Sequence, residues 1–225
     1  MQGKMIKNNT SKITVIFPGW AFDSRIFWTL PPDSCFIFID TIKAIHSEDD
    51  FRKLLDQYKF EKFNLVGWSM GAYIAAEFAR RYSERIEKLV LVSARESYEK
   101  NQLIAVKKLL NRNKVDYLRA FYKECFSGEA VELYSRFEKT LFKDYLELFS
   151  EEALNIGLDY LSSAGFNFID PGKIKTFIVS GTRDKIAPCE EAFKISANIH
   201  SSKTIIMGNE GHMPFFGEKF WKMIT

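Results

Sequence analysis

Short hydrophobic runs alternate with longer amphipathic stretches along most of the chain. Six runs of four or five residues are rich in β-branched and aromatic side chains and lack strict alternation, which is typical of strands buried on both faces. They are Ile13–Phe17, Cys35–Ile39, Phe63–Val66, Lys88–Val92, Thr176–Val179 and Thr204–Met207. Helices are expected at about 48–58, 70–82, 189–198 and 216–224. This order predicts an α/β fold in which a mostly parallel sheet has helices on both faces.

The alternation stops once, between Ser97 and Phe166, where no segment has the pattern of a strand. Hydrophobic residues recur there at helical spacing. They fall into three sets: Leu103, Val106 and Leu110; Leu118, Phe121 and Tyr122; and Phe137, Leu141, Tyr145 and Leu148. We therefore expect a helical cap over residues 97–165, inserted into an α/β core made of residues 1–96 and 166–225.

Composition excludes several classes of protein. Of the 225 residues, 46% are hydrophobic and 15% aromatic, which is enough for one well-buried core and too much for a disordered chain. No apolar run approaches the roughly 20 residues of a membrane span. The 32 basic and 29 acidic residues are too balanced to indicate nucleic-acid binding.

The cysteines and the first residues of the chain indicate which cysteine-based sites to exclude and which cellular compartment to expect. Cys35, Cys125 and Cys189 are far apart and form no CxxC pair, which argues against a zinc ribbon, a dithiol redox site and a disulfide scaffold. No motif for a metal or an organic cofactor is found. The apolar stretch Ile13–Phe17 is too short for a signal peptide, so we expect a cytoplasmic protein.

The strongest chemical motif is Gly67-Trp68-Ser69-Met70-Gly71, which joins the strand FNLV to the helical stretch AYIAAEFARRY. Glycines on both sides of a serine permit the tight strand-to-helix turn that exposes a nucleophilic hydroxyl. The helix N-terminus that follows offers backbone N–H groups to a developing oxyanion. Ser69 is therefore the candidate nucleophile.

A serine hydroxyl needs a base, and the chain has three histidines. His46 lies in a polar stretch, and His200 precedes the last strand. His212 follows that strand, at the carboxyl end, where the active sites of parallel sheets form. We therefore predict that His212 is the base.

The base needs a carboxylate to orient it. Asp184 follows the strand TFIVSG, which gives the chain order Ser, Asp, His. Glu96, just after KLVLV, is the main alternative, and Asp170 is a weaker one because it precedes its strand. Capping of a helix, or pairing with a neighbouring cation, would explain Asp184 without catalysis.

Two backbone amides are expected to form the oxyanion hole. One is that of Met70, directly after the nucleophile, and the other is that of Trp20, in the loop Pro18-Gly19-Trp20-Ala21 after the first strand. The Trp20 and Trp68 side chains would wall the substrate pocket, although either alone also suits a core aromatic.

These motifs resemble the α/β-hydrolase superfamily over nearly the whole chain. Within it, the chain looks most like the family of pimeloyl-[acyl-carrier protein] methyl ester esterases of biotin synthesis. The resemblance rests on PGWAFDSRIFW, GWSMGA, FIVSGTRDKIAP and GHMPFF, and LNIGLDYLSS resembles the family's segment before the acid strand. Pro18-Gly19 replaces the usual His-Gly, Ala21 replaces a glycine, and the N-terminal strand pair is expected to be lost or much shortened.

The resemblance implies a serine esterase that removes a methyl group from a pimeloyl chain held on acyl carrier protein. It also implies that basic residues of the cap meet that acidic partner. Residues 100–125 carry seven basic and two acidic side chains, and 126–165 carry three basic and eight acidic ones. We assign this contact to Arg119 and Lys123, with Lys107, Lys108, Arg112 and Lys139 as further candidates.

Other functions remain open at this point, because one fold and one triad serve many reactions. A general carboxylesterase, a thioesterase and a menaquinone-pathway synthase would all carry the same motifs. A binding protein that retains the hydrolase fold without catalysis is the alternative from a different class.

Overall fold

A parallel sheet runs through the centre of the computed structural model, which describes residues 3–6, 13–32, 34–46, 53, 56, 61–166, 174–199 and 202–224. Seven strands within these ranges form one sheet in the order β1-β3-β2-β4-β5-β6-β7. Six of them are parallel, and β1 pairs antiparallel with β3 at one edge. The strands are β1 (Gly3–Ile6), β2 (Ile13–Phe17), β3 (Cys35–Ile39), β4 (Phe63–Trp68), β5 (Ile86–Val92), β6 (Lys175–Gly181) and β7 (Lys203–Met207).

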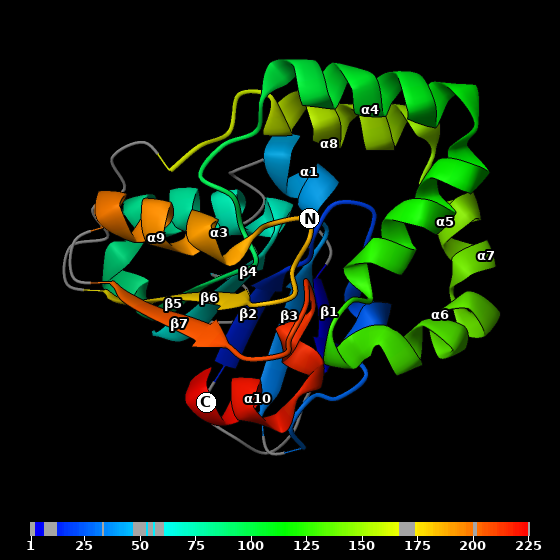
Figure 1. Ribbon diagram of the computed structural model, residues 1–225. Coiled ribbons are helices and arrows are strands. Elements are labelled where there is room, and N and C mark those ends of the chain that lie inside the picture. Colours follow the sequence, from blue (N-terminus) through cyan, green and yellow to red (C-terminus); the bar gives the residue numbers. More distant parts are fainter. Residues whose placement is uncertain are drawn as a thin grey trace.

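Helices cover both faces of the sheet, as its apolar strands require. Every residue of β3 and β4 is buried, which matches the unbroken hydrophobic run of β3 and the mainly hydrophobic run of β4. Figure 1 shows α3 (Met70–Arg81) and α9 (Cys189–Asn198) on one side of the sheet and α10 (Glu218–Ile224) on the other. A short helix, α1 (Thr41–His46), follows β3 and contacts α3.

Between β5 and β6 the described chain is helical, and we call α4–α8 the cap helices. They are α4 (Lys100–Arg112), α5 (Lys114–Cys125), α6 (Tyr134–Thr140), α7 (Phe142–Leu148) and α8 (Glu151–Leu161). Two of them begin at capping residues: Asn113 accepts from the amide of Asp116, and Ser150 from that of Ala153. These helices stand to one side of the sheet in Figure 1, with α4 and α8 next to each other.

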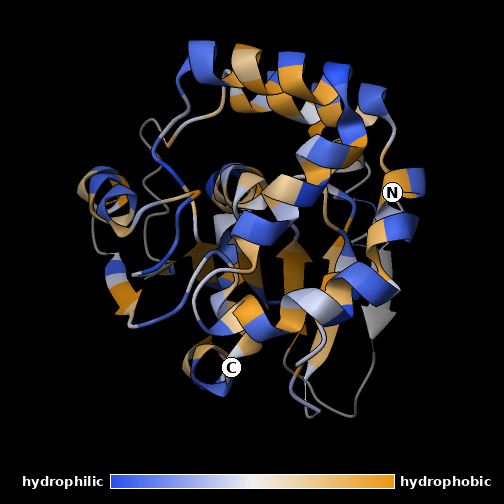
Figure 2. Cartoon of the chain, turned by 45° about the vertical axis from the view of Figure 1, so that its right-hand side comes forward, coloured by the Kyte–Doolittle hydropathy of each residue, from blue (hydrophilic) through white to orange (hydrophobic). Residues whose placement is uncertain are grey.

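Each cap helix buries one stripe of hydrophobic side chains. Figure 2 shows hydrophobic colour concentrated on the central strands, whereas the surrounding helices carry both hydrophobic and hydrophilic residues. Leu110, Leu118, Tyr122, Phe137 and Tyr145 have no exposed surface and join the same core as the sheet. Burial of this kind contributes most of the stability of a helix in a folded protein.

The predicted strands are all present, and the helices at 70–82, 189–198 and 216–224 correspond to α3, α9 and α10. Of the helix expected at 48–58, Lys53 and Asp56 are helical and the rest lies outside the described residues. At the N-terminus one short strand, β1, is present, which agrees with the expected shortening and not with a complete loss. The sequence reading also did not foresee α1.

One predicted stripe is wrong at its end. Phe137, Leu141 and Tyr145 are buried, but Leu148 is 53% exposed. Leu148 is the last residue of α7, so the buried stripe ends one turn earlier, at Tyr145.

The described residues contain neither a membrane-spanning helix nor a cluster of side chains that could hold a metal ion. No helix there combines the length and the hydropathy that crossing a membrane requires. No cluster of three or more histidine, cysteine or acidic side chains with the arrangement of a metal site occurs in the same residues.

Candidate active site

Ser69 stands at the sharp turn between β4 and α3. Its backbone has φ 53° and ψ −118°, a left-handed conformation that a residue with a side chain adopts at a cost. The flanking glycines allow the turn. A Cβ on Gly67 would lie 2.4 Å from the carbonyl oxygen of Gly71, and one on Gly71 would lie 2.1 Å from that of Phe17. The motif Gly-x-Ser-x-Gly is therefore required by close backbone approach, as the sequence suggested.

His212 and Asp184 meet at the carboxyl end of the sheet. His212 lies in the loop after β7, and Asp184 lies in the loop after β6. The Nδ1 atom of His212 is 2.8 Å from Oδ2 of Asp184, and both side chains are buried. The structure thus brings together two of the residues that the motif order had singled out, 28 positions apart.

The Asp184 carboxylate is fixed on its other side by the backbone. Its Oδ1 atom accepts hydrogen bonds from the amides of Ile186 and Ala187, each at 2.9 Å. Two amide donors on one oxygen restrain the rotation of the carboxylate. Asp184 is therefore oriented with one oxygen toward its own loop and the other toward the imidazole.

The acid loop and the histidine loop are also bonded to each other. The amide of Arg183 donates to the carbonyl of Glu210 at 2.8 Å, and the amide of Asn209 donates to the Thr182 hydroxyl at 3.0 Å. A Cβ on Gly181 would lie 2.2 Å from the Glu210 carbonyl oxygen, which shows how closely the loops approach. These contacts hold Asp184 and His212 in register.

The second ring nitrogen of His212 is available for chemistry. Nε2 is buried and has no hydrogen-bond partner among the described residues. The Ser69 hydroxyl is therefore not bonded to it in this structure, and such bonds are often long without substrate. A neutral imidazole with Nδ1–H on the carboxylate keeps Nε2 as the acceptor that a base needs.

Trp68 packs directly beside this histidine. Its Nε1 atom donates to the carbonyl oxygen of His212 at 2.8 Å, and the two rings lie 5.6 Å apart. Its ring also contacts Phe22 and Phe215 and is 1% exposed. In this structure Trp68 therefore joins the nucleophile turn to the histidine loop, while its contact with substrate stays a prediction.

The loop after β2 approaches the nucleophile closely. A Cβ on Gly19 would lie 3.3 Å from the Cβ of Ser69, so the backbone there leaves little room for a side chain. Trp20 follows, with its indole buried, and Met70 is the first residue of α3. The amides of Trp20 and Met70 thus belong to the two segments that flank Ser69, and their role as oxyanion donors stays a prediction.

The other candidates for the acid and the base are not found at the contact between His212 and Asp184. Glu96 accepts a hydrogen bond from the Asn198 side chain at 2.8 Å, away from the imidazole that Asp184 already contacts. Asp170 and His200 lie outside the described residues. His46 ends helix α1, and its side chain is likewise not described.

Tyr98 is a residue of this region that the sequence reading missed. Burial raises its pKa to about 12, the Arg95 guanidinium opposes this, and the Asp184 charge adds to it. The Ser69 hydroxyl is also near enough to lower this pKa slightly. The guanidinium carbon of Arg95 lies 5.1 Å from the centre of the Tyr98 ring. The only available signal was its position six residues after the end of a parallel strand.

A buried thiol lies close to the same centre. Burial, followed by the Asp184 charge, raises the pKa of Cys125 well above its usual value, so the thiol is neutral. It is fully buried and belongs to no disulfide. Because a thiolate is the reactive form of cysteine, Cys125 is not a competing nucleophile.

The two basic residues assigned to partner binding differ in their surroundings. Arg119 is half exposed, its Nε atom lies 3.6 Å from Oε1 of Glu138, and its guanidinium lies 4.9 Å from the Phe142 ring centre. Lys123 is exposed, and no ion pair involving it is found in the described part of the chain. Lys107, one of the further candidates, forms an ion pair with Asp159.

Comparison with solved structures identifies the fold. An esterase from Exiguobacterium antarcticum superposes with a TM-score of 0.81 at 19% identity, covering 99% of this chain and 91% of that one. A bromoperoxidase from Bacillus anthracis gives a TM-score of 0.83 at 19% identity, covering 97% and 92%. At this level of identity the likeness concerns the fold alone.

Comparison of sequences leads to the family. The family model described as the alpha/beta hydrolase fold matches residues 30–151, and the chain belongs to this family. A pimeloyl-[acyl-carrier protein] methyl ester esterase from Legionella pneumophila (strain Corby) is 25% identical over 232 aligned positions. That alignment covers 89% of this chain and 87% of the relative.

Proposed function

We propose that the chain is a serine carboxylesterase with the triad Ser69, His212 and Asp184. The observation that carries the proposal is the buried contact between His212 Nδ1 and Asp184 Oδ2, 2.8 Å long, at the same sheet edge as the strained turn that holds Ser69. An imidazole oriented in this way presents Nε2 as a base. Membership of the hydrolase family supports the same reaction class.

The mechanism follows from these positions. The Ser69 hydroxyl oxygen attacks the ester carbonyl carbon while His212 Nε2 takes its proton. The amides of Trp20 and Met70 donate hydrogen bonds to the oxyanion that develops. The alcohol leaves with the proton from His212, and an acyl-enzyme remains. A water molecule then gives its proton to His212 and attacks the acyl carbon, which releases the acid and restores the serine.

The proposed substrate is the methyl ester of pimeloyl-[acyl-carrier protein], so methanol and the free terminal carboxylate are the products. Support comes from the relatives with that name, which include a protein from Wigglesworthia glossinidia brevipalpis that is 25% identical and covers 92% of this chain. This assignment places the reaction in biotin synthesis and in the cytoplasm. Residues 1–96 and 166–225 would form the catalytic core, and 97–165 the cap.

The carrier protein would dock on the basic part of the cap. Lys123 is exposed there, and Arg119 keeps about half of its side chain exposed beside Glu138. An acidic partner would compete with Glu138 for the Arg119 guanidinium, whereas Lys123 needs no such exchange. Charge pairs at an exposed rim mainly steer association, so the expected effect is on the rate of encounter.

Mass spectrometry of methyl-pimeloyl-acyl carrier protein tests the whole proposal. The carrier is incubated with wild type or with Ser69→Ala, and a fluorophosphonate probe measures the reactive serine in parallel. Loss of the methyl group with wild type alone supports the assignment. A methyl ester that stays intact while small free esters are cleaved would keep the triad and reject this substrate.

A second outcome would overturn the catalytic assignment itself. If the purified wild type neither reacts with the probe nor cleaves any ester, the non-catalytic binding protein becomes the better description. A rate for Ser69→Ala equal to that of wild type would remove Ser69 from the mechanism. Thioester substrates in the same assay separate an esterase from a thioesterase.

A further inference from the structure

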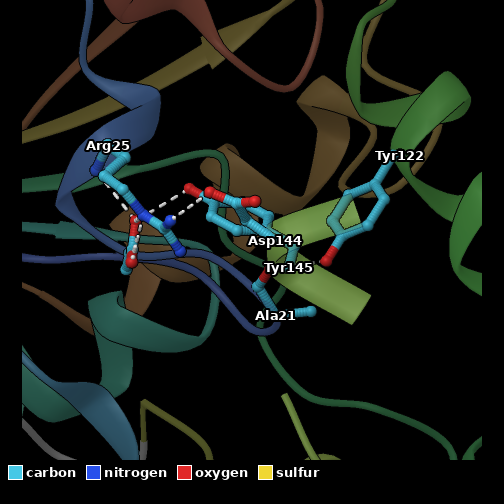
Figure 3. Close-up of polar contacts among 6 residues, drawn as sticks. Ala21, Arg25, Tyr122, Asp144 and Tyr145 are labelled. Carbon is cyan, nitrogen blue, oxygen red and sulfur yellow. Dashed lines mark hydrogen bonds and ion pairs between the residues drawn. The ribbon is translucent and has the colours of Figure 1, made fainter. Parts of the chain in front are cut away.

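Cap helices hold the loop of residues 19–23, which we call the oxyanion loop, at successive positions. The Tyr122 hydroxyl of α5 donates to the carbonyl oxygen of Ala21 at 2.9 Å. The Tyr145 hydroxyl of α7 donates to Oδ1 of Asp23 at 2.9 Å. Figure 3 shows both tyrosines directed toward this loop. Two residues more than 100 positions further along the chain thus contact the loop that precedes the nucleophile.

A third cap helix, α8, holds Trp20, the residue that precedes Ala21 in the oxyanion loop. The indole nitrogen of Trp20 donates to the carbonyl of Leu154 in α8 at 2.9 Å. Its ring lies edge-on to Phe121 at 5.0 Å. Gly157 of α8 lies beneath the same ring, because a Cβ there would be 2.5 Å from Cδ1 of Trp20. Trp20 is therefore clamped through its side chain, which leaves its backbone amide free for another role.

The backbone of the loop needs such support. Ala21 has φ 60°, in the left-handed region that residues with a Cβ occupy only when their surroundings hold them there. The amide of Phe22 donates to the carbonyl of Gly19 at 3.2 Å, so residues 19–22 form one hydrogen-bonded turn. A displacement of the Ala21 carbonyl would therefore move the whole turn, including the Trp20 amide.

Tyr122 is well suited to hold this carbonyl. Its side chain is fully buried, with the Phe22 ring at 5.0 Å and the Phe137 ring at 4.8 Å. Burial raises its pKa well above the usual value, so the hydroxyl stays protonated and remains a donor. Within the described residues it is the hydrogen-bond partner found for the Ala21 carbonyl.

The bond to Asp23 is less critical by comparison. The Asp23 Oδ1 atom also accepts from the amide of Arg25 at 2.9 Å, and the Arg25 guanidinium continues to Asp144 at 3.1 Å. Figure 3 shows this chain of contacts from Arg25 to Asp144. Loss of the Tyr145 hydroxyl would therefore leave Asp23 with hydrogen-bond donors, whereas loss of the Tyr122 hydroxyl would leave the Ala21 carbonyl buried without this bond.

We infer that Tyr122 is a positioning residue for catalysis, which fixes the Trp20 amide at the oxyanion through the Ala21 carbonyl. The inference rests on the proposed function for its catalytic meaning. It gives the cap a second task besides covering the site. A misplacement of catalytic groups by ~1 Å can cost about 10²-fold in rate, so one hydroxyl is enough to matter.

Tyr122→Phe tests this with one atom removed. Active enzyme is first titrated with a fluorophosphonate, and kcat and KM are then measured with p-nitrophenyl acetate. We expect kcat per titrated site to fall at least about tenfold with KM changed less than about twofold, since the oxyanion exists only after attack. Affinity for a trifluoromethyl ketone, which forms the tetrahedral adduct, should fall by the same factor. Tyr145→Phe should have a smaller effect.

Tyr73→Phe is the matched control. Its hydroxyl is also buried and donates to a backbone carbonyl, that of Arg95, at 2.7 Å, away from the oxyanion loop. This variant should lose similar stability and keep its kcat. Equal loss of kcat in the two variants, or wild-type kcat in Tyr122→Phe, would overturn the inference.

Hydrogen exchange separates this inference from the proposed function. Amides of residues 19–23 should exchange faster in Tyr122→Phe and remain unchanged in Tyr73→Phe. If wild type cleaves no ester, the proposed function fails, and faster exchange still shows that Tyr122 holds the loop. Unchanged exchange would reject the role of Tyr122 whatever the activity of the wild type.

Discussion

His212 Nδ1 lies 2.8 Å from Asp184 Oδ2, and neither side chain has appreciable exposure to solvent. The other Asp184 oxygen accepts two backbone amide bonds, so the carboxylate has a fixed direction. This arrangement selects the imidazole tautomer with its proton on Nδ1 and leaves Nε2 unpaired within the described residues. This geometry supports the proposed role of His212 as the general base.

Replacing the carboxylate should separate the two candidate acids. In Asp184→Asn the amide still fills the space, but it no longer selects the correct tautomer or stabilises the imidazolium. We expect kcat for a small ester to fall by about 10³–10⁴ while the fold is retained. Steady-state kinetics and circular dichroism of the purified variant measure both quantities.

Glu96→Gln is the comparison for this prediction. Glu96 bonds to Asn198, and a glutamine oxygen can accept that same bond, so its kcat should stay within about twofold of wild type. An active Asp184→Asn together with an inactive Glu96→Gln would transfer the role of the acid to Glu96.

A methyl group added at Gly157 of α8 should disturb the active site because it displaces the Trp20 ring. Gly157→Ala places a Cβ 2.5 Å from Cδ1 of the Trp20 indole, which is rigid and already bonded to Leu154. We expect kcat to drop at least about tenfold as the ring moves, because ~1 Å displacements are costly in catalysis. The overpacking should lower the free energy of unfolding by about 1–3 kcal/mol, and the higher helix propensity of alanine offsets part of this loss.

Gly208→Ala is the matched substitution, since nothing lies within 4 Å of a Cβ at that position. Its kcat and its free energy of unfolding should remain near the wild-type values, within about 0.5 kcal/mol for the latter. If Gly157→Ala keeps full activity, the clamp on Trp20 is not important for the reaction.

Much of the fold could be predicted from periodicity alone. The parallel strands are short and predominantly apolar, and most lie next to stretches of helical spacing, so local sequence was sufficient for Cys35–Ile39 and its neighbours. The strand at Gly3–Ile6 was missed because an edge strand needs only its pairing partner, here Cys35–Ile39, and no hydrophobic run. The exposed Leu148 shows a similar limit, since helical spacing does not reveal that α7 ends at this residue, one turn beyond the buried Tyr145.

Residues of the candidate site could be predicted only where a reactive side chain follows the end of a strand. Ser69, Asp184 and His212 each come directly after or shortly after a strand of a parallel sheet, so the topology collects them at one edge. Tyr122 gave no such signal. It lies 101 residues from Ala21, and its contact arises from the packing of α5, which one sequence does not specify.

Stability should depend on pH through Glu210, which lies two residues before the proposed base. Burial, followed by the charge of Glu129, raises the pKa of this carboxyl to about 7, and Lys219 opposes the rise. The folded protein therefore keeps a proton between about pH 4.5 and 7 that the unfolded chain releases. The free energy of unfolding should then fall as the pH rises through this window, by at least about 1 kcal/mol.

Urea unfolding at pH 5 and pH 7.5 measures this effect. Glu210→Gln removes the titrating group, so the difference between the two pH values should shrink. Glu129→Gln removes the neighbouring charge and should shift the transition to lower pH. A wild type that becomes more stable between pH 5 and 7.5, with the same slope in Glu210→Gln, would contradict the assignment.

Charge reversal on the cap should affect a carrier-bound substrate and spare a small one. Arg119→Glu combined with Lys123→Glu reverses two exposed or half-exposed cations on the surface of the cap. We expect kcat/KM for methyl-pimeloyl-acyl carrier protein to fall at least about tenfold, more strongly at low salt, because exposed charges act mainly on association. Cleavage of p-nitrophenyl acetate should be unchanged. Lys175→Glu combined with Lys203→Glu makes the same change in net charge at the opposite end of the parallel strands, and an equal loss with that variant or on the small ester would argue against docking at Arg119 and Lys123.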